Sequence, residues 1–175
     1  LVRMCACRGT AGLAHVSCLA EQAKILVADA EERNLDDDKW ARWYTCSLCE
    51  QQYHGVVRCA LGWACWKTHV GRPEDDWALI NAMTELGGGL YGAKSFADAL
   101  TVREAELAMA RRLGHSAGNI LCVQGNLAIT YEMMGQLDRA QQMKRDVYSG
   151  YLDLSGEEDE LTLVAASNLA SLLKR

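Results

Sequence analysis

Proline and long apolar runs are both scarce in this sequence. Only one of its 175 residues is proline while half are apolar, a composition that favours a folded, helix-rich protein over a disordered one. The best candidate for a membrane helix, Val56 to Trp66, contains Arg58 and is shorter than the roughly 18 residues that cross a bilayer. We therefore expect no membrane partner.

Basic residues are in the minority as well. The chain has 18 Lys and Arg residues against 23 Asp and Glu residues, a formal net charge of −5, whereas a nucleic-acid binder usually carries a basic stripe. A secretory leader is not apparent, because Cys5 and Cys7 stand where its apolar core would lie. We expect a protein of the cytoplasm, with the nucleus as the alternative, and no nucleic-acid partner.

Cysteine, by contrast, is concentrated at one end: seven of the eight lie in the first 65 residues. Three close pairs of Cys and His stand out, and one tight turn can aim such a pair at a single ion about 2.0–2.3 Å away. A disulfide is the competing explanation, but a Cys-x-Cys bridge would be strained and no export signal is present. The pattern predicts structural Zn²⁺ with the ligands Cys5, Cys7, His15, Cys18, Cys46 and Cys49.

Other residues are weaker candidates for chemistry. Cys59 and Cys65 have poor spacing for metal ligands and are predicted to be buried thiols, with His54 as an alternative ligand. His15 and Cys18 could lie side by side like a base and a nucleophile, but no orienting Asn or Asp and no oxyanion donor can be identified. No catalytic residue is predicted.

The ligand pairs resemble those of the RING-CH, or variant RING, finger, whose ligands run four Cys, one His and three Cys. Cys-x-Cys, seven residues and His-x-x-Cys match its middle portion, and Cys46-Ser47-Leu48-Cys49 with its flanking aromatic residues matches its last portion. The family's opening Cys-x-x-Cys is absent, because the sequence begins after the point where it should lie. The family's cross-braced pairing implies one complete site of Cys5, Cys7, Cys46 and Cys49, and leaves His15 and Cys18 as half of a second site.

The second half of the chain repeats itself. Asn126-Leu127-Ala128 recurs 42 residues later as Asn168-Leu169-Ala170, and self-similarity at a period near 40 indicates a helical repeat array. Helices are expected around Leu121–Met134 and Leu137–Leu152, with Gly135-Gln136 as the turn between them.

The motif Asn-Leu-Ala-x-x-Tyr-x-x-x-Gly at 126–135 resembles tetratricopeptide repeats of the kinesin-light-chain type. About two and a half repeats would fit, and Glu85 takes the place of the asparagine in the first. The resemblance implies a concave groove for a peptide or partner helix, with Asn126 and Asn168 as polar contacts on its inner face. The alternative is that these asparagines only satisfy helix termini or neighbouring backbone groups.

Three local patterns connect these motifs. Helical spacing predicts an amphipathic helix after Cys18, through Leu19, Ala23, Leu26, Val27 and Ala30, and a solvated loop at Asp36-Asp37-Asp38. A helix should stop before Pro73, and the acidic residues that follow suit the first turn of the next helix. Trp63, Trp66 and Trp77 are predicted to pack in the core, with docking of the finger onto the repeats as the alternative.

We therefore expect a mostly α-helical fragment of a longer protein. A small zinc-stabilised RING-like finger would occupy residues 1–72, and an α-helical tetratricopeptide repeat solenoid would occupy residues 73–175. The two resemblances imply a ubiquitin ligase-like protein, whose finger would recruit a ubiquitin-conjugating enzyme and whose repeats would bind a substrate or partner. The alternative is a non-catalytic zinc-finger and tetratricopeptide scaffold for protein–protein interaction.

Overall fold

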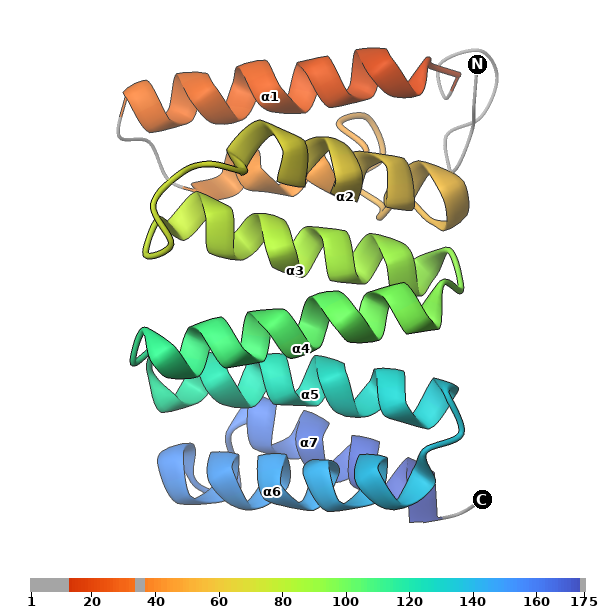
Figure 1. The fold of residues 1–175 in the computed structure, drawn as a ribbon, viewed down its shortest axis with the longest axis vertical. Coiled ribbons are helices and arrows are strands. Elements are labelled where there is room, and N and C mark those ends of the chain that lie inside the picture. The colour runs from red at the N-terminus through yellow and green to blue at the C-terminus, as the bar shows by residue number, and fades with distance from the viewer. Residues whose placement is uncertain (1–12, 34–36, 174–175) are drawn as a thin grey trace. The chain divides into compact units, whose positions relative to one another are not determined.

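The structure is a computed structural model and describes residues 13–33 and 37–173. Within these ranges it contains helices and no strand, so the prediction of a mostly α-helical fold is confirmed for this part of the chain (Figure 1). No helix in the described ranges is long and apolar enough to cross a membrane. The elements are α1 (Val16–Glu32), the short 3₁₀ helix η2 (Asp37–Trp43), α2 (Gly55–His69), α3 (Trp77–Gly92), α4 (Phe96–Arg112), α5 (Ala117–Met133), α6 (Leu137–Ser155) and α7 (Glu160–Leu173).

The chain separates into two compact units, residues 1–99 and 100–175. Helix α4 begins in the first unit and continues into the second. The sequence predicts a domain boundary near residue 72. A helix does end close to this position, since α2 stops at His69, ahead of Pro73. However, α3 folds back along α2 and belongs to the same unit, so the division of the structure comes later in the chain.

The turn between α2 and α3 follows the sequence signals in part: the helix after Pro73 forms, but its first turn contains none of the predicted acidic residues, because Glu74 and Asp75 precede it. Asp76 is the N-cap of α3, and its carboxylate accepts a hydrogen bond from the Ala78 N–H at 2.8 Å. A side-chain acceptor at this position satisfies one of the backbone donors that the start of a helix leaves without a partner. Arg72 reinforces the turn, since its guanidinium contacts both carboxylate oxygens of Glu31 at 2.9–3.0 Å.

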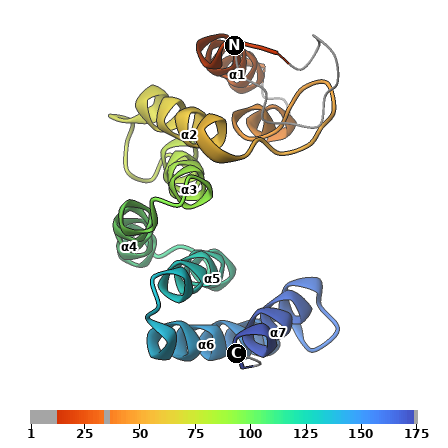
Figure 2. The same cartoon turned by 90° about the vertical axis from the view of Figure 1, so that its right-hand side faces the viewer.

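The core of the first unit is built by four elements together (Figure 2). The amphipathic helix predicted after Cys18 is confirmed as α1, which buries Ala23, Val27 and Ala30. The acidic segment differs from its prediction: Asp37 and Asp38 open η2 rather than forming a loop, and Asp36 lies outside the described residues. The shared cluster consists of Ala23 and Val27 from α1, Trp40 and Trp43 from η2, Cys65 from α2, and Ala78 and Ala82 from α3.

The tryptophans singled out from the sequence are not the buried ones. Trp63 and Trp77 are 40% and 41% exposed, so the prediction that they pack in the core is wrong. Trp63 and Trp66 form an edge-on pair on α2 with their ring centroids 5.9 Å apart, while Trp77 lies edge-on to Trp40 at 4.8 Å. The residue that fills the core is Trp43, which is fully buried.

Glycines let α2 and α3 approach each other more closely than ordinary side chains would allow. A Cβ atom at Gly62 would lie 2.6 Å from the Glu85 carbonyl oxygen, and one at Gly89 would lie 2.8 Å from the Arg58 carbonyl oxygen. Contacts this short between a Cβ and backbone cannot be relieved by turning a side chain. The two helices therefore touch backbone to backbone at this crossing.

The second unit has a core of its own. Helices α5 and α6 confirm the two predicted around Leu121–Met134 and Leu137–Leu152, and Gly135 takes the left-handed backbone conformation, φ +73°, that turns the chain between them. Their inner faces, together with α4 and α7, enclose two apolar clusters. These clusters contain Leu107, Val123, Leu127, Tyr131, Ala140 and Leu172, and Leu121, Val147, Tyr151 and Ala165.

The backbone contact between α2 and α3 generates a stability prediction. Gly89→Ala should destabilise the chain by about 1–3 kcal/mol, because the added methyl group forces the two backbones apart. The matched control is Gly92→Ala in the same helix, where the Cβ would meet only Arg58 Cγ at an ordinary 3.8 Å. Urea unfolding followed by circular dichroism measures both variants. Equal midpoints for the two variants would contradict the crossing described here.

His69 is the buried titratable group of this core. It is 1% exposed, lies beside Trp40 and Trp43 with ring centroids 5.2 and 6.1 Å away, and its Nδ1 donates to the Cys65 carbonyl oxygen at 2.8 Å. Burial lowers the pKa of His69, and the hydrogen bond to Cys65 offsets only part of that effect. A second proton would put a charge on a ring that is almost completely buried, which disfavours the charged form.

Acidification should therefore weaken the first unit. The unfolded chain binds a proton at His69 below about pH 6.5, whereas the folded chain does so only at lower pH, so stability is complete above that value and falls below it. We expect His69→Gln to flatten this dependence, because glutamine can keep the donor and does not titrate. Urea midpoints at about pH 7.5 and about pH 5.5 test this. If acidification lowers the urea midpoint of the wild type no more than that of the variant, His69 is not the cause of the pH dependence.

Candidate functional site

The predicted metal ligands fall into a described and an undescribed group. Cys5 and Cys7 lie outside the described residues, whereas His15, Cys18, Cys46 and Cys49 lie within them. The described residues therefore hold two of the three predicted pairs.

The pair formed by Cys46 and Cys49 sits on a tight hairpin. The Cys46 N–H donates to the Gln51 carbonyl oxygen at 2.9 Å, and the Glu50 N–H donates back to the Cys46 carbonyl oxygen at 2.9 Å. Glu50 adopts the left-handed conformation, φ +57°, which reverses the chain directly after Cys49. This geometry and the Cys-x-x-Cys spacing are those of a turn that can present two thiolates to one ion.

The hairpin is held against α1 and α2 by apolar contacts. Cys46 is buried in a cluster with Tyr53, Val57 and Leu61, and Cys49 packs on the edge of the same cluster. Val16, Leu19 and Ala20, from the first turns of α1, complete it. The hairpin therefore lies beside the end of α1 at which His15 and Cys18 stand.

His15 and Cys18 form the second described pair. His15 is the N-cap of α1, Cys18 is in its first turn, and both side chains are exposed. The Cys18 sulfur lies 4.0 Å from His15 Nδ1. Among the residues that the structure describes, no three His, Cys, Asp or Glu side chains gather closely enough to hold a metal ion, so this pair and the Cys46 pair do not together form a metal site.

The two cysteines of α2 have the character of packing residues. Cys65 is fully buried, which confirms the prediction of a buried thiol, and burial raises the pKa of that thiol. Cys59 is half-buried, and burial again raises its pKa, with Arg58 partly opposing the effect. Neither thiol is made more nucleophilic by its surroundings.

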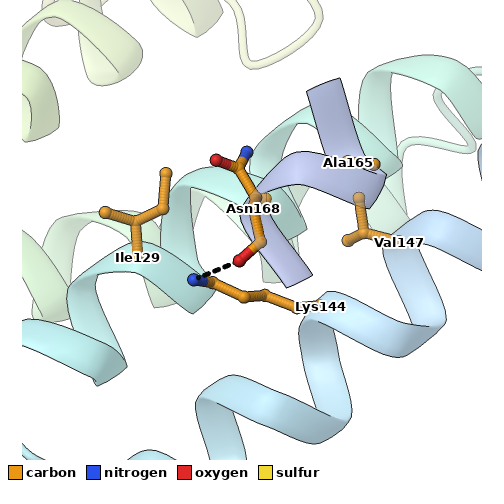
Figure 3. Close-up of a pocket in the computed structure, with 6 residues that line it drawn as sticks. Ile129, Lys144, Val147, Ala165 and Asn168 are labelled. Atoms are coloured by element: carbon orange, nitrogen blue, oxygen red, sulfur yellow. Dashed lines mark hydrogen bonds between the residues drawn. The ribbon is translucent and has the colours of Figure 1, made fainter. Parts of the chain in front are cut away.

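Asn126 and Asn168, the predicted partner-binding residues, lie on α5 and α7. Arg103 donates to the Asn126 carbonyl oxygen at 2.7 Å, and Lys144 donates to the Asn168 carbonyl oxygen at 3.0 Å (Figure 3). In each case a basic side chain of one helix donates a hydrogen bond to the backbone of the next helix in the chain. Figure 3 shows the Asn168 amide pointing away from the Lys144 ammonium group. Both asparagine side chains are half-buried.

Glu85, which replaces the asparagine in the first repeat, keeps the same backbone contact and adds an ion pair. Arg58 donates to the Glu85 carbonyl oxygen at 3.3 Å and forms a salt bridge with its carboxylate. Trp40 Nε1 donates to the same carboxylate at 3.4 Å. Burial raises the pKa of Glu85, while Arg58 opposes that shift. Arg58 also lies over the Tyr44 ring, 5.5 Å from its centroid, so one guanidinium joins α2, α3 and the segment before the hairpin.

The hollow beside Asn168 is too small for a ligand. It lies among Gly125, Ile129, Lys144, Val147, Ala165 and Asn168, and its volume is about 10 Å³ (Figure 3). That is room for one water molecule, and the nearby ammonium group and backbone carbonyl would suit it. A partner that uses Asn126 and Asn168 would therefore lie across the surface rather than insert a side chain here.

Sequence reasoning missed the three basic residues that donate hydrogen bonds to the carbonyl oxygens of Glu85, Asn126 and Asn168. Arg58 was read only as an interruption of an apolar run, and Arg103 and Lys144 received no role. A signal was present, since Arg103 and Lys144 are 41 residues apart, within one residue of the 42 that separate the two asparagines whose carbonyl oxygens they contact. Buried basic side chains at a repeat period indicate internal partners.

Compared with known proteins, the chain matches no family model and no curated protein. Its function is therefore argued from the residues and their arrangement.

Proposed function

We propose that this chain is a zinc-binding, ubiquitin ligase-like protein that joins a RING-CH-type finger to peptide-binding helical repeats. The observation that carries the proposal is the packing of the Cys46–Cys49 hairpin against the first turns of α1, where His15 and Cys18 stand. Two pairs of predicted ligands that are far apart in the sequence thus lie near the same end of α1, without three of their side chains gathering around one point in the described residues.

The described ligands fit zinc by their chemistry. Two thiols on a tight hairpin supply half of a tetrahedral Cys₄ set, and Cys5 and Cys7 would supply the other half under the cross-braced pairing. The ion would cross-link the chain and do no bond chemistry. The chain's own residues prepare the hairpin through the backbone hydrogen bonds of Cys46 and the apolar contacts of Tyr53 and Val57.

In this proposal the ubiquitin transfer itself belongs to the partner. The finger would hold a ubiquitin-conjugating enzyme, and the repeats would select the protein that is modified. Asn126 and Asn168 would meet the backbone of an extended peptide or partner helix, because amides offer both a donor and an acceptor. Arg103 and Lys144, which contact the two asparagines, donate to carbonyl oxygens of the chain itself. The proposal therefore does not require an acidic partner to neutralise them.

A non-catalytic scaffold is the second candidate, and one observation favours it. The segment between the second and third described ligands, η2, puts Trp40 and Trp43 into the helical core of the first unit. A finger built into a core in this way is a stable platform whether or not it meets a conjugating enzyme.

The zinc content of the purified chain tests the finger. We expect close to one tightly held zinc ion per chain, since Cys5, Cys7, Cys46 and Cys49 form one complete set whereas His15 and Cys18 offer only two ligands. Replacing Cys46 and Cys49 with serine should remove the ion, and His15→Ala should leave it in place. Native mass spectrometry reads the count directly. Absence of zinc would refute the finger, and two ions would refute the pairing.

Discharge of a ubiquitin-charged conjugating enzyme separates the ligase from the scaffold. Residues 1–175 carry six of the eight ligands in the family's pattern, so the comparison is between this chain and one preceded by a Cys-x-x-Cys ligand pair. Faster discharge by the extended chain supports the ligase. Equal rates, both at background, support the scaffold.

A further inference from the structure

We infer that two copies of this chain associate through the outer face of α2, with the two helices antiparallel and Trp63 of each copy seated on Ala64 of the other. The inference goes beyond the proposed finger and repeats and requires neither zinc nor a peptide. Its basis is the distribution of apolar residues around α2, which is apolar on two opposite sides.

The inner side of α2 faces the core of the first unit. Val57, Leu61, Cys65 and His69 recur every four residues, and all four are buried. A helix at the surface of a protein normally has such an apolar side and carries polar residues on the side that faces water.

The outer side of α2 departs from this rule. Val56, Ala60, Trp63 and Lys67 follow one another at spacings of four, three and four residues, which keeps them on one side of the helix. Val56 and Trp63 are 66% and 40% exposed. Between residues 56 and 67 the exposed residues of α2 are Val56, Trp63 and Lys67, of which only Lys67 is polar.

Helix α6 provides the contrast within the same chain. Between residues 139 and 149 its exposed residues are Arg139, Gln142, Arg145, Asp146 and Ser149, all of them polar. A helix that is apolar all round is normally buried. The outer side of α2 therefore has the composition of a covered face, whereas that of α6 does not.

The centre of this outer face is an open hollow. Its volume is about 580 Å³, and it is lined by Ala60, Trp63, Ala64 and Lys67. Four residues at such spacings, i, i+3, i+4 and i+7, form the hole that receives one side chain of a facing helix in knobs-into-holes packing. Because two of the four are alanines, the hollow can take a large apolar side chain.

The hollow is complementary to a second copy of itself. When two copies of α2 run antiparallel about the middle of the hollow, Trp63 of one faces Ala64 of the other, and Lys67 faces Ala60. Each large side chain then meets a small one, and the two Lys67 ammonium groups lie at opposite ends of the contact. Trp66 lies edge-on to Trp63 with ring centroids 5.9 Å apart, so the Trp63 ring has little freedom to lose on association.

Analytical ultracentrifugation of the whole chain at micromolar concentrations tests the association. One helix pair is smaller than a standard interface of roughly 1,600 Å², so we expect a reversible dimer with a micromolar dissociation constant. Trp63→Ala should weaken the dimer about tenfold or more, because each copy loses its aromatic anchor. The matched control is Trp77→Ala, which should leave association unchanged, since Trp77 is 41% exposed in the same unit but lies on α3.

Charged substitutions at Ala60 test the antiparallel register. Ala60 would face Lys67 of the other copy, whereas Lys67 of its own helix lies seven residues away, about 10 Å along the axis. Ala60→Glu should therefore give a dimer about tenfold tighter than Ala60→Lys does, since two attractive contacts replace two repulsive ones. Overall repulsion between copies of net charge −5 predicts the opposite order. In a Lys67→Glu background the order of the two variants should reverse.

The other outcomes overturn the inference. A monomer at every concentration would leave the outer face of α2 to a different protein, and a dimer that Trp63→Ala does not weaken would place the contact elsewhere. Equal association of the two Ala60 variants would show that the helices are not antiparallel in this register. Circular dichroism checks that each variant is folded, and the wild type with the Ala60 variants decides the question if Trp63→Ala does not fold. None of these results bears on the finger, which the zinc count tests separately.

Discussion

The close crossing of α2 over α3 is the contact on which the first unit depends. Backbone touches backbone at Gly62 and Gly89, and the salt bridge between Arg58 and Glu85 closes the crossing. A buried ion pair adds little net stability compared with apolar side chains of the same size, because both charges lose their hydration. Its effect is selective: any arrangement that separates the two charges without exposing them to water is strongly disfavoured.

This crossing changes how the two halves of the sequence relate to each other. A cysteine-rich finger followed by repeats reads as two modules with a linker at Pro73. In the structure α2 connects the cysteine hairpin with α3, since one of its faces covers Cys46 and its Arg58 binds the Glu85 carbonyl oxygen. The same link, from a basic side chain to a carbonyl oxygen, recurs within the second unit between Arg103 and Asn126 and between Lys144 and Asn168.

Local patterns in the sequence predicted several of the helices, although the segment at Asp37 and Asp38 was predicted as a loop and begins η2. The spacing of Ala23 and Val27 predicted α1, Gly135 predicted the turn between α5 and α6, and the acidic residues after Pro73 predicted that a new helix follows, since each signal acts within a few residues.

Contacts between distant residues could not be predicted in this way. Arg58 and Glu85 are 27 residues apart, so nothing local identifies the arginine as one half of a buried pair. The burial of Trp43 and the exposure of Trp63 likewise depend on which helix covers which face. The pairs His15–Cys18 and Cys46–Cys49 are described, while zinc binding stays a prediction because Cys5 and Cys7 lie outside the described residues.

A double-mutant cycle across Arg58 and Glu85 tests the central claim most directly. Urea unfolding is measured for the wild type, Arg58→Met, Glu85→Gln and the double variant. If the two side chains form the buried pair at the crossing, the stability losses of the two single variants should sum to more than the loss of the double variant. The difference, the coupling free energy, should be about 2 kcal/mol or more. A coupling below about 0.5 kcal/mol, the value expected for residues without a shared contact, would contradict the account.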